Sequence, residues 1–212
     1  MPANNKISGI YVIVDPEHTL GRNIIDVVKQ VLDAGANVIQ LRNKISTEEE
    51  ISKSADKIQE IINSYNKTFI LNDYVNIAKN LNTDGVHIGQ KDMSIMKART
   101  ILNHEQIIGS SNATLNEAKN SENSGSDYIA VGSMFETRTK NDTRPAGIKT
   151  LRKVREYTEK SIVAIGGIKL ENCAELIESG ADSLCIASAI TKSDNIFDAC
   201  KKFVDKFDQI RK

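Results

Sequence analysis

The sequence predicts an α/β protein, a (β/α)8 (TIM) barrel built as a single domain over residues 1–212. Short apolar runs alternate with helical patterns along the chain, and eight such strand–helix units fit about the minimum length for this barrel. Four segments also repeat one order of helix end, glycine turn and apolar strand, in which glycine stops the helix. These segments are DAGANVIQL, NTDGVHIG, SGSDYIAVG and ESGADSLCI.

Each predicted strand is a short apolar run bounded by polar or turn residues. In chain order the runs are GIYVIVD (9–15), VIQLR (38–42), TFILND (68–73), GVHIG (85–89), IIGSSN (107–112), DYIAVG (127–132), IVAIGGI (162–168) and SLCIASAI (183–190). The helices between them carry apolar residues at helical spacing. The first predicted helix places on one face Ile24, Val28, Val31 and Leu32. The last predicted helix places on one face Ile196, Cys200, Phe203, Phe207 and Ile210.

The second predicted helix opens with Ser46 and Glu49 at capping-box spacing, in which two side chains satisfy free backbone N–H groups. Further helices are expected from about Val75 and over 95–102, 115–118, 148–157 and 173–177. An open, doubly wound sheet would use the same alternation. The barrel is favoured because eight units fit and because no GxGxxG motif follows the first strand.

Composition and charge exclude several classes of protein. Lys+Arg and Asp+Glu are equal at 28 each, whereas a general nucleic-acid or membrane-surface binder would need a basic excess. No apolar run approaches the ~20 residues of a membrane span, and MPANNKISG lacks the pattern of a signal peptide. Cys173, Cys185 and Cys200 show no CxxC spacing, which favours small buried side chains in a reducing compartment and no zinc site. We therefore expect a cytoplasmic protein that binds neither nucleic acid nor membranes.

A cationic cluster follows the second predicted strand. In IQLRNK, strand period two puts Gln40, Arg42 and Lys44 on one face, directed into the mouth of the barrel at the carboxyl ends of the strands. Such barrels place their sites there. Buried cations need a partner, so the cluster predicts either a bound anion or a salt-bridge network with neighbouring acids.

Two carboxylates follow the next two strands, Asp73 at the end of TFILND and Asp92 after GVHIGQ. Adjacent strands would bring both over the same mouth, and Mg²⁺ commonly takes one or two carboxylates together with phosphate oxygens. The alternative is that each aspartate caps the helix that follows it. His87, within GVHIG, is expected to be a hydrogen-bonded lining residue rather than a base.

The segment ETRTKNDTRPAG contains no large apolar side chain, although the strand-like run YIAVGSMF leads into it. Thr137, Thr139 and Lys140 can donate hydrogen bonds to phosphate oxygens. AIGGI (164–168) allows a close backbone approach, and Ser188 is expected at the end of strand eight, where such barrels often bind phosphate. The mouth is thus expected to hold two anion sites, one with metal near strands two to four and one without metal near strands six to eight.

Seven segments, in order and at family-like spacing, resemble the thiamine-phosphate synthase family. They are QLRNK, LNDYVNIA, DGVHIGQKD, GSSNAT, VGSMFETRTKND, VAIGGI and GADSLCIASAI, and the likeness runs from YVIVD to ASAI, nearly the whole chain. The resemblance implies a (β/α)8 barrel that joins an aminopyrimidine methyl diphosphate to a thiazole phosphate, releasing diphosphate and giving thiamine phosphate.

By position, the resemblance implies three groups of site residues. The pyrimidine diphosphate would contact Gln40, Arg42, Lys44, Asn72, Ser111 and Lys140; Mg²⁺ would be held by Asp73 and Asp92; and the thiazole phosphate would contact Thr137, Arg138, Thr139, Gly167, Ala187 and Ser188. Three positions depart from the family pattern, with Asn43 replacing an acid, Glu136 a proline and Ala187 a larger aliphatic residue. Asn43 is expected to face away from the site, and Glu136 to place a negative charge beside a phosphate.

The implied chemistry needs a stabilised leaving group rather than an acid–base pair. Arg42, Lys44 and Lys140, with Mg²⁺, are expected to neutralise the charge that grows on the departing diphosphate. The partners would be two small phosphorylated molecules, and the sequence leaves open a homo-oligomer. The alternatives are a thiazole tautomerase of the same family, a phosphate-binding barrel isomerase, and a non-catalytic protein that binds thiamine phosphate.

Overall fold

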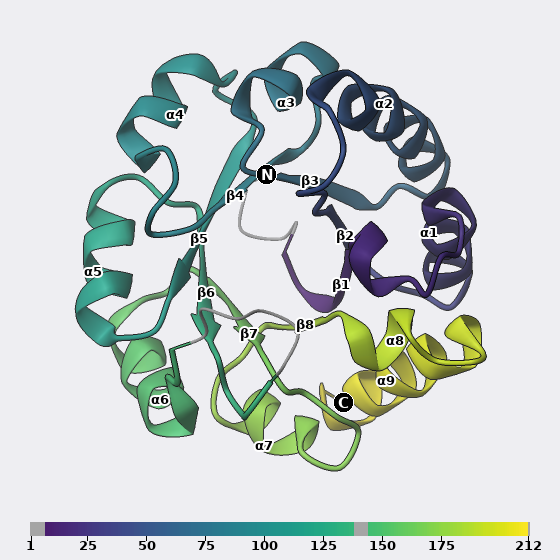
Figure 1. The fold of residues 1–212 in the computed structure, drawn as a ribbon. Coiled ribbons are helices and arrows are strands. Elements are labelled where there is room, and N and C mark those ends of the chain that lie inside the picture. Colours follow the sequence, from purple (N-terminus) through teal and green to yellow (C-terminus); the bar gives the residue numbers. More distant parts are fainter. Residues whose placement is uncertain (1–6, 138–143, 212) are drawn as a thin grey trace.

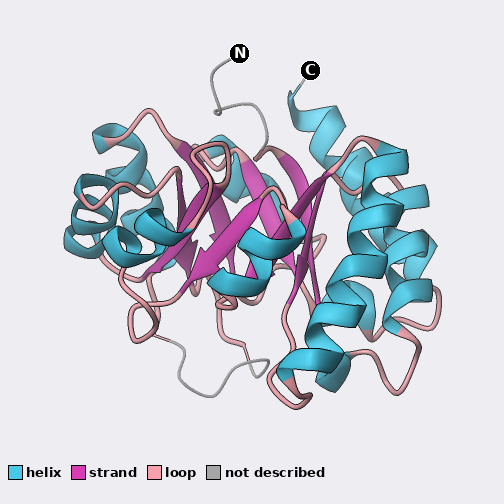
Figure 2. Ribbon diagram, turned by 90° about the horizontal axis from the view of Figure 1, so that it is seen from above, coloured by secondary structure: helices cyan, strands magenta, loops and turns pink. Residues whose placement is uncertain are grey.

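The structure, a computed structural model, describes residues 7–137 and 144–211. Over these residues, eight parallel strands close into a barrel in chain order, and β1 (Gly9–Val14) lies between β8 (Ser183–Ile186) and β2 (Val38–Leu41). Figure 1 looks along this barrel, with the helices outside the ring of strands, and Figure 2 shows the helices flanking the strands from above. Closure of the ring confirms the predicted barrel and rules out the open sheet.

The remaining strands and the helices alternate along the chain as predicted. The strands are β3 (Thr68–Asn72), β4 (Gly85–Ile88), β5 (Ile107–Asn112), β6 (Tyr128–Gly132) and β7 (Ser161–Ile165). The helices are the 3-10 turn η2 (Pro16–His18), α1 (Ile24–Asp33), α2 (Glu48–Tyr65), α3 (Val75–Leu81), α4 (Ile95–Ile101), α5 (Leu115–Asn123), α6 (Gly147–Tyr157), α7 (Cys173–Glu178), α8 (Ser188–Thr191) and α9 (Ile196–Arg211). Within the described ranges, no helix has the length and apolar character needed to cross a membrane.

Two layers of apolar side chains hold the barrel together, and β2 shows how the sequence produces both. Val38 belongs to the cluster inside the barrel, whereas Ile39 and Leu41 belong to the larger cluster between the strands and the helices. Gln40 is buried on the inner side, where its amide donates a hydrogen bond to the Tyr11 hydroxyl at 2.6 Å. The predicted period-two alternation is therefore confirmed along this strand.

The start of α2 differs by one residue from the prediction. Thr47, not Ser46, is the N-cap: its hydroxyl accepts from the backbone N–H of Glu50, and the Glu50 carboxylate accepts from the backbone N–H of Thr47 at 2.9 Å. The Ser46 hydroxyl instead accepts from the Asn43 amide at 3.0 Å. The sequence STEEE permits both capping boxes, and the turn that Asn43 stabilises after β2 decides between them.

The end of β8 also differs, because the strand stops at Ile186, earlier than the predicted run SLCIASAI. Ser188 is therefore the first residue of α8 and not the end of a strand. The Thr191 hydroxyl donates to the backbone oxygen of His18 at 2.8 Å, and its own carbonyl accepts from the Arg22 guanidinium at 3.1 Å. These bonds fix α8 against the loop that follows β1.

Three of the four repeated helix ends carry the predicted glycine with a positive φ, at Gly35, Gly125 and Gly180. In NTDGVHIG the residue with positive φ at the end of α3 is instead Asn82, at 51°, and Gly85 is the first residue of β4. Asparagine adopts this left-handed conformation more readily than most residues, because its short polar side chain can hydrogen-bond locally.

Candidate functional site

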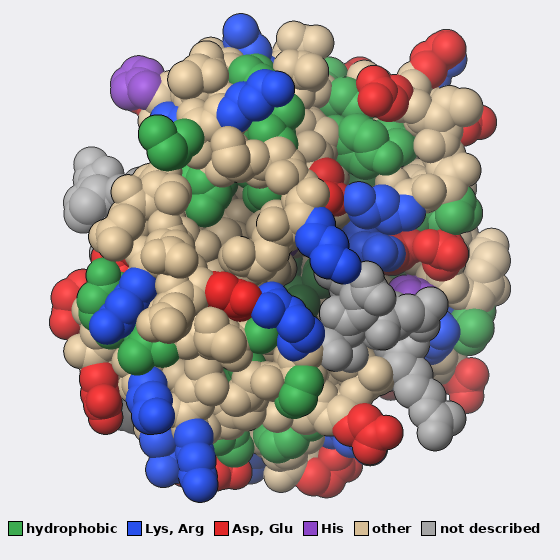
Figure 3. All heavy atoms as spheres, turned by 60° about the vertical axis from the view of Figure 1, so that its left-hand side comes forward, with side chains coloured by type: hydrophobic (Ala, Val, Ile, Leu, Met, Phe, Trp, Pro, Cys, Tyr) green, Lys and Arg blue, Asp and Glu red, His purple; other side chains and the backbone are tan. Residues whose placement is uncertain are grey.

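A cavity of about 1150 Å³, bounded by the described residues, opens at the carboxyl ends of the barrel strands. Figure 3 shows Lys and Arg side chains, with acidic ones among them, around a hollow on this side of the molecule. The volume exceeds the roughly 300–1000 Å³ of common small-molecule pockets. The cavity is thus large enough for two ligands side by side.

Most of the predicted site residues line this one cavity. They are Arg42, Lys44, Asn72, Asp73, Asp92, Ser111, Thr137, Gly167, Ala187 and Ser188. Gln40 lies in the barrel interior, where it is bonded to Tyr11. Arg138, Thr139 and Lys140 lie outside the described residues.

The two predicted cations have carboxylate partners. Arg42 pairs with Asp15, which lies directly after β1 and is 1% exposed, and Lys44 pairs with Asp73. The salt-bridge alternative is therefore realised for both cations, and the bound anion remains a prediction. Asp15 was missed because its pairing with Arg42 depends on the β1–β2 register, in which Val14 lies beside Leu41.

Asp73 and Asp92 are not helix caps, so that alternative was wrong for both. The N-cap of α3 is Tyr74, without a side-chain hydrogen bond, and the N-cap of α4 is Ser94. The Asp92 carboxylate accepts from the backbone N–H of Gly89 at 3.0 Å, which turns it back toward the strand end. Asp73 has a φ of 65°, a conformation that is uncommon for a residue with a Cβ and that occurs at functional sites.

The two carboxylates interact with each other. Burial raises the pKa of Asp73, the Lys44 ammonium lowers it, and the neighbouring Asp92 raises it further through its charge and a hydrogen bond. The net direction is upward. The Asn72 amide also donates to the Asp73 carboxylate, at 2.6 Å. This half of the cavity therefore combines two crowded acids with an amide and a cation.

The opposite half of the cavity is built where the loops after β6 and β7 meet. The backbone N–H of Phe135 donates to the carbonyl of Gly166 at 3.0 Å. A Cβ on Gly167 would lie 2.5 Å from the carbonyl oxygen of Glu136, so the glycine that sequence analysis singled out leaves room for the neighbouring loop. That loop carries Thr137 to the cavity wall.

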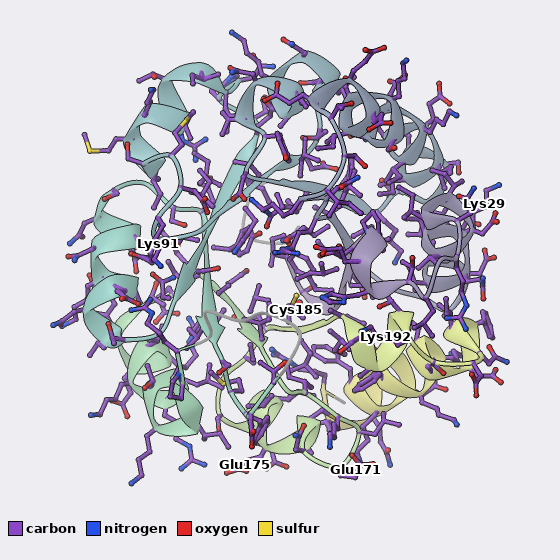
Figure 4. All side chains as sticks on the ribbon, viewed as in Figure 1. Lys29, Lys91, Glu171, Glu175, Cys185 and Lys192 are labelled. Carbon is purple, nitrogen blue, oxygen red and sulfur yellow. The ribbon has the colours of Figure 1, made fainter. Side chains whose placement is uncertain are left out.

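The first turn of α8 completes this half. Ala187 and Ser188 line the cavity, as does the exposed Lys192 at the end of α8, which Figure 4 labels beside that helix. Lys192 and His18, which also lines the cavity, were not among the predicted site residues. Neither lies in a strand pattern, so the sequence offered no periodicity by which to find them.

The three departures from the family pattern fall in different surroundings. Asn43 is buried and its side-chain oxygen accepts from the backbone N–H groups of Ile45 and Ser46, so it faces its own turn as expected. Glu136 and Ala187 both line the cavity. Only the latter two therefore lie where a substrate would be.

The cysteines are buried and unpaired, and Cys185 lies within the ring of strands and borders the cavity (Figure 4). Burial raises the pKa of the Cys173 and Cys185 thiols, and that of Cys200 to about 12. The thiols are therefore protonated at neutral pH, which does not suit a thiolate nucleophile.

Comparisons with known proteins agree with this arrangement. Residues 10–190 match the family described as "Thiamine monophosphate synthase". The chain is 37% identical over 193 residues to the thiamine-phosphate synthase of Clostridium novyi, covering 91% of this chain and 95% of that protein. It is 40% identical over 185 residues to that of Methanosarcina mazei, covering 87% and 77%. A solved thiamine phosphate pyrophosphorylase from Pyrococcus furiosus superposes with a TM-score of 0.90 at 30% identity, covering 98% of each chain.

Proposed function

The chain belongs to the thiamine monophosphate synthase family and is a transferase of that family, and on this premise we propose that it makes thiamine phosphate from two phosphorylated substrates. The substrates would be 4-amino-2-methyl-5-(diphosphooxymethyl)pyrimidine and a thiazole-ethyl phosphate, and the second product diphosphate. The observation that carries the proposal is one cavity with two unlike halves. One half holds Arg42, Lys44, Asp73 and Asp92, and the other holds Thr137 and the loop at Gly167.

The residues present fit a magnesium ion. Asp92 raises the pKa of Asp73 through its charge and a hydrogen bond, and a bound divalent cation held by the two carboxylates would offset this repulsion. Among residues 7–137 and 144–211, no group of three or more His, Cys, Asp or Glu side chains could hold a metal ion. Mg²⁺ commonly takes one or two carboxylates and completes its shell with phosphate oxygens and water, so Asp73 and Asp92 would be its protein ligands here. When bound, the ion would withdraw charge from the leaving diphosphate.

The protein's own residues supply the rest of the proposed chemistry. Arg42 and Lys44, oriented by Asp15 and Asp73, would bind the diphosphate and stabilise it as it departs. Diphosphate leaves from a carbon next to an electron-rich ring, which delocalises the positive charge. The thiazole nitrogen then attacks that carbon without the help of a base, and Lys140 would add to the stabilisation of the leaving group.

The second half of the cavity would hold the thiazole phosphate in line for this attack. Thr137 can donate its hydroxyl to a phosphate oxygen, and Ser188 can do the same from the start of α8. The negative charge of Glu136 beside them would weaken phosphate binding, and Lys192 would offset part of that charge.

The test is an incubation of the protein with both substrates and Mg²⁺, read for thiamine phosphate by chromatography. We expect Asp92→Ala to reduce turnover strongly, with excess Mg²⁺ restoring it only in part. Asp56→Ala, on the exposed face of α2, is the matched control and should leave turnover unchanged. An unchanged turnover in Asp92→Ala would contradict the role of Asp92 in metal binding. The absence of thiamine phosphate from the incubation with the unaltered protein would overturn the proposed function.

The same incubation separates the alternatives. A thiazole tautomerase would convert the thiazole phosphate alone, and a binding protein would retain thiamine phosphate without forming it. A thiazole tautomerase would not need the cluster of Arg42, Lys44, Asp73 and Asp92, because it binds no diphosphate. An isomerase would need an acid–base pair at the strand ends, whereas the histidine there, His87, is bonded within the barrel to Tyr128 and Ser111.

A further inference from the structure

A chain of hydrogen bonds crosses the barrel beneath the cavity and joins five residues from five strands. The Gln40 amide donates to the Tyr11 hydroxyl at 2.6 Å, and that hydroxyl lies 3.0 Å from the Tyr128 hydroxyl. The Tyr128 hydroxyl lies 3.0 Å from Nδ1 of His87, and Nε2 of His87 lies 2.8 Å from the Ser111 hydroxyl. Gln40, Tyr11, Tyr128 and His87 are buried, and the last two residues of the chain of hydrogen bonds, His87 and Ser111, line the cavity.

The amide at one end sets the direction in which hydrogens are donated along this chain. The Tyr11 oxygen accepts from Gln40, and because Tyr128 is the one other hydrogen-bond partner of this hydroxyl among the described residues, the Tyr11 hydrogen is directed at the Tyr128 oxygen. Tyr128, having accepted from Tyr11, directs its hydrogen at Nδ1 of His87. Burial raises the pKa of both phenols well above the ordinary value of 10.0, which keeps both hydroxyl hydrogens in place.

The direction of these hydrogen bonds determines, through His87, which way the Ser111 hydroxyl points at the cavity. Because Nδ1 accepts, a neutral His87 carries its hydrogen on Nε2 and donates it to the Ser111 oxygen. The Ser111 oxygen is then occupied as an acceptor, and its own hydrogen is free to point into the cavity. The opposite direction, with Ser111 donating to Nε2, would turn a lone pair of the serine toward an anionic substrate.

We propose that His87 is a positioning residue, held by Tyr128 as the neutral tautomer with its hydrogen on Nε2, which makes Ser111 a hydrogen-bond donor toward the bound substrate. That this substrate is the pyrimidine diphosphate rests on the proposed function. The arrangement of hydrogens rests on the five-residue chain alone. His87 itself would not touch the reacting atoms, and it would act through the serine.

The protein has three histidines, so nitrogen NMR of protein labelled with ¹⁵N-histidine gives a direct test. In the protein without substrate, His87 should show a protonated Nε2 and an unprotonated Nδ1, with its signals assigned by their loss in His87→Gln. Tyr128→Phe removes the donor to Nδ1 but keeps the ring, which packs on Gly109. In that variant both tautomers should be populated, and the KM for the pyrimidine diphosphate should rise about tenfold, as expected for one lost hydrogen bond, while the KM for the thiazole phosphate stays the same.

The matched control is Tyr65→Phe. Its hydroxyl also donates to a protein group, Asp33 at 2.6 Å, but at the ends of α1 and α2 and outside the cavity lining. It should change neither the spectrum nor either KM. The spectrum of the unaltered protein needs only the His87→Gln assignment, so it remains decisive even where Tyr128→Phe fails to fold.

A hydrogen on Nδ1 of His87, or an imidazolium at neutral pH, would overturn the proposal. So would a Tyr128→Phe spectrum that is the same as that of the unaltered protein. If the tautomer is as expected but no thiamine phosphate forms, the proposed function fails and this inference stands. If thiamine phosphate forms and the tautomer is reversed, the inference fails alone.

Discussion

Replacing Gly167 with alanine tests how the loop that carries Thr137 is held at the cavity wall. Gly167 has a φ of +66°, and a residue with a Cβ loses about 1–2 kcal/mol in that left-handed conformation. The added Cβ would lie 2.5 Å from the Glu136 carbonyl oxygen and 2.8 Å from the Phe135 Cβ, and no side-chain rotation relieves these contacts. Overpacking of this kind costs about 1–3 kcal/mol. We therefore expect Gly167→Ala to lower the free energy of unfolding by about 2–5 kcal/mol.

Gly125→Ala is the matched control, because Gly125 also has a positive φ, of +96°, but no atom lies within 4 Å of its ideal Cβ. Urea unfolding of the two variants should differ by about 1–3 kcal/mol, the part due to the close approach. Any movement of the loop that relieves the contact would carry Thr137 with it and raise the KM for thiazole phosphate. Equal unfolding free energies together with an unchanged KM would refute the reasoning.

Three further predictions follow from contacts in the site and at the start of α2. Thr47→Ala should lower the free energy of unfolding by about 1 kcal/mol in urea, since it removes the N-cap, and no loss would contradict the cap. The contribution of Asp73 to stability is fully present below its ordinary pKa of 3.8 and is lost as the pH rises through its higher folded value, because its pKa is raised. Asp92→Asn should therefore lower the pKa of Asp73, seen by carboxyl NMR titration, and make the metal-free protein more stable at neutral pH; a pKa that stays or rises is the contrary result. Asp15→Asn should raise the KM for the pyrimidine diphosphate roughly tenfold or more and leave that for thiazole phosphate alone, because Arg42 loses the partner that orients it; equal effects on both would contradict this.

The sequence predicted the barrel and the strand faces because period two is a local property. Gln40 and Leu41 fall on opposite sides of β2 as the alternation requires. The boundary of α2 was off by one residue because Ser46 and Thr47 are both followed by glutamate three positions later. The turn stabilised by Asn43 determines that Thr47 is the N-cap, and the local sequence pattern does not distinguish Thr47 from Ser46.

The pairings across the barrel could not be predicted, because they depend on which strands face one another and at what height. Asp15 reaches Arg42 through the β1–β2 register, and Tyr11 reaches Tyr128 across the interior. Asp15, Tyr11 and Tyr128 read in the sequence as ordinary strand residues, and Arg42 was predicted at the mouth but without its partner. The motifs that carried the family resemblance lie at strand ends, so they located the mouth of the barrel. They did not identify the buried residues that orient the site side chains.

Pairing of β1 with β8 affects how the protein folds during its synthesis. The Ser183 hydroxyl bonds to the carbonyl of Gly9, 174 positions earlier, so the ring is completed by the most distant partners in the chain. Contacts of such long range slow folding, and synthesis delivers the first strand well before the last. Until β8 arrives, β1 has an unpaired edge and the cavity lacks the wall formed by Ala187 and Ser188, so a ribosome-bound chain that already contains Asp73 and Asp92 would have only part of the site.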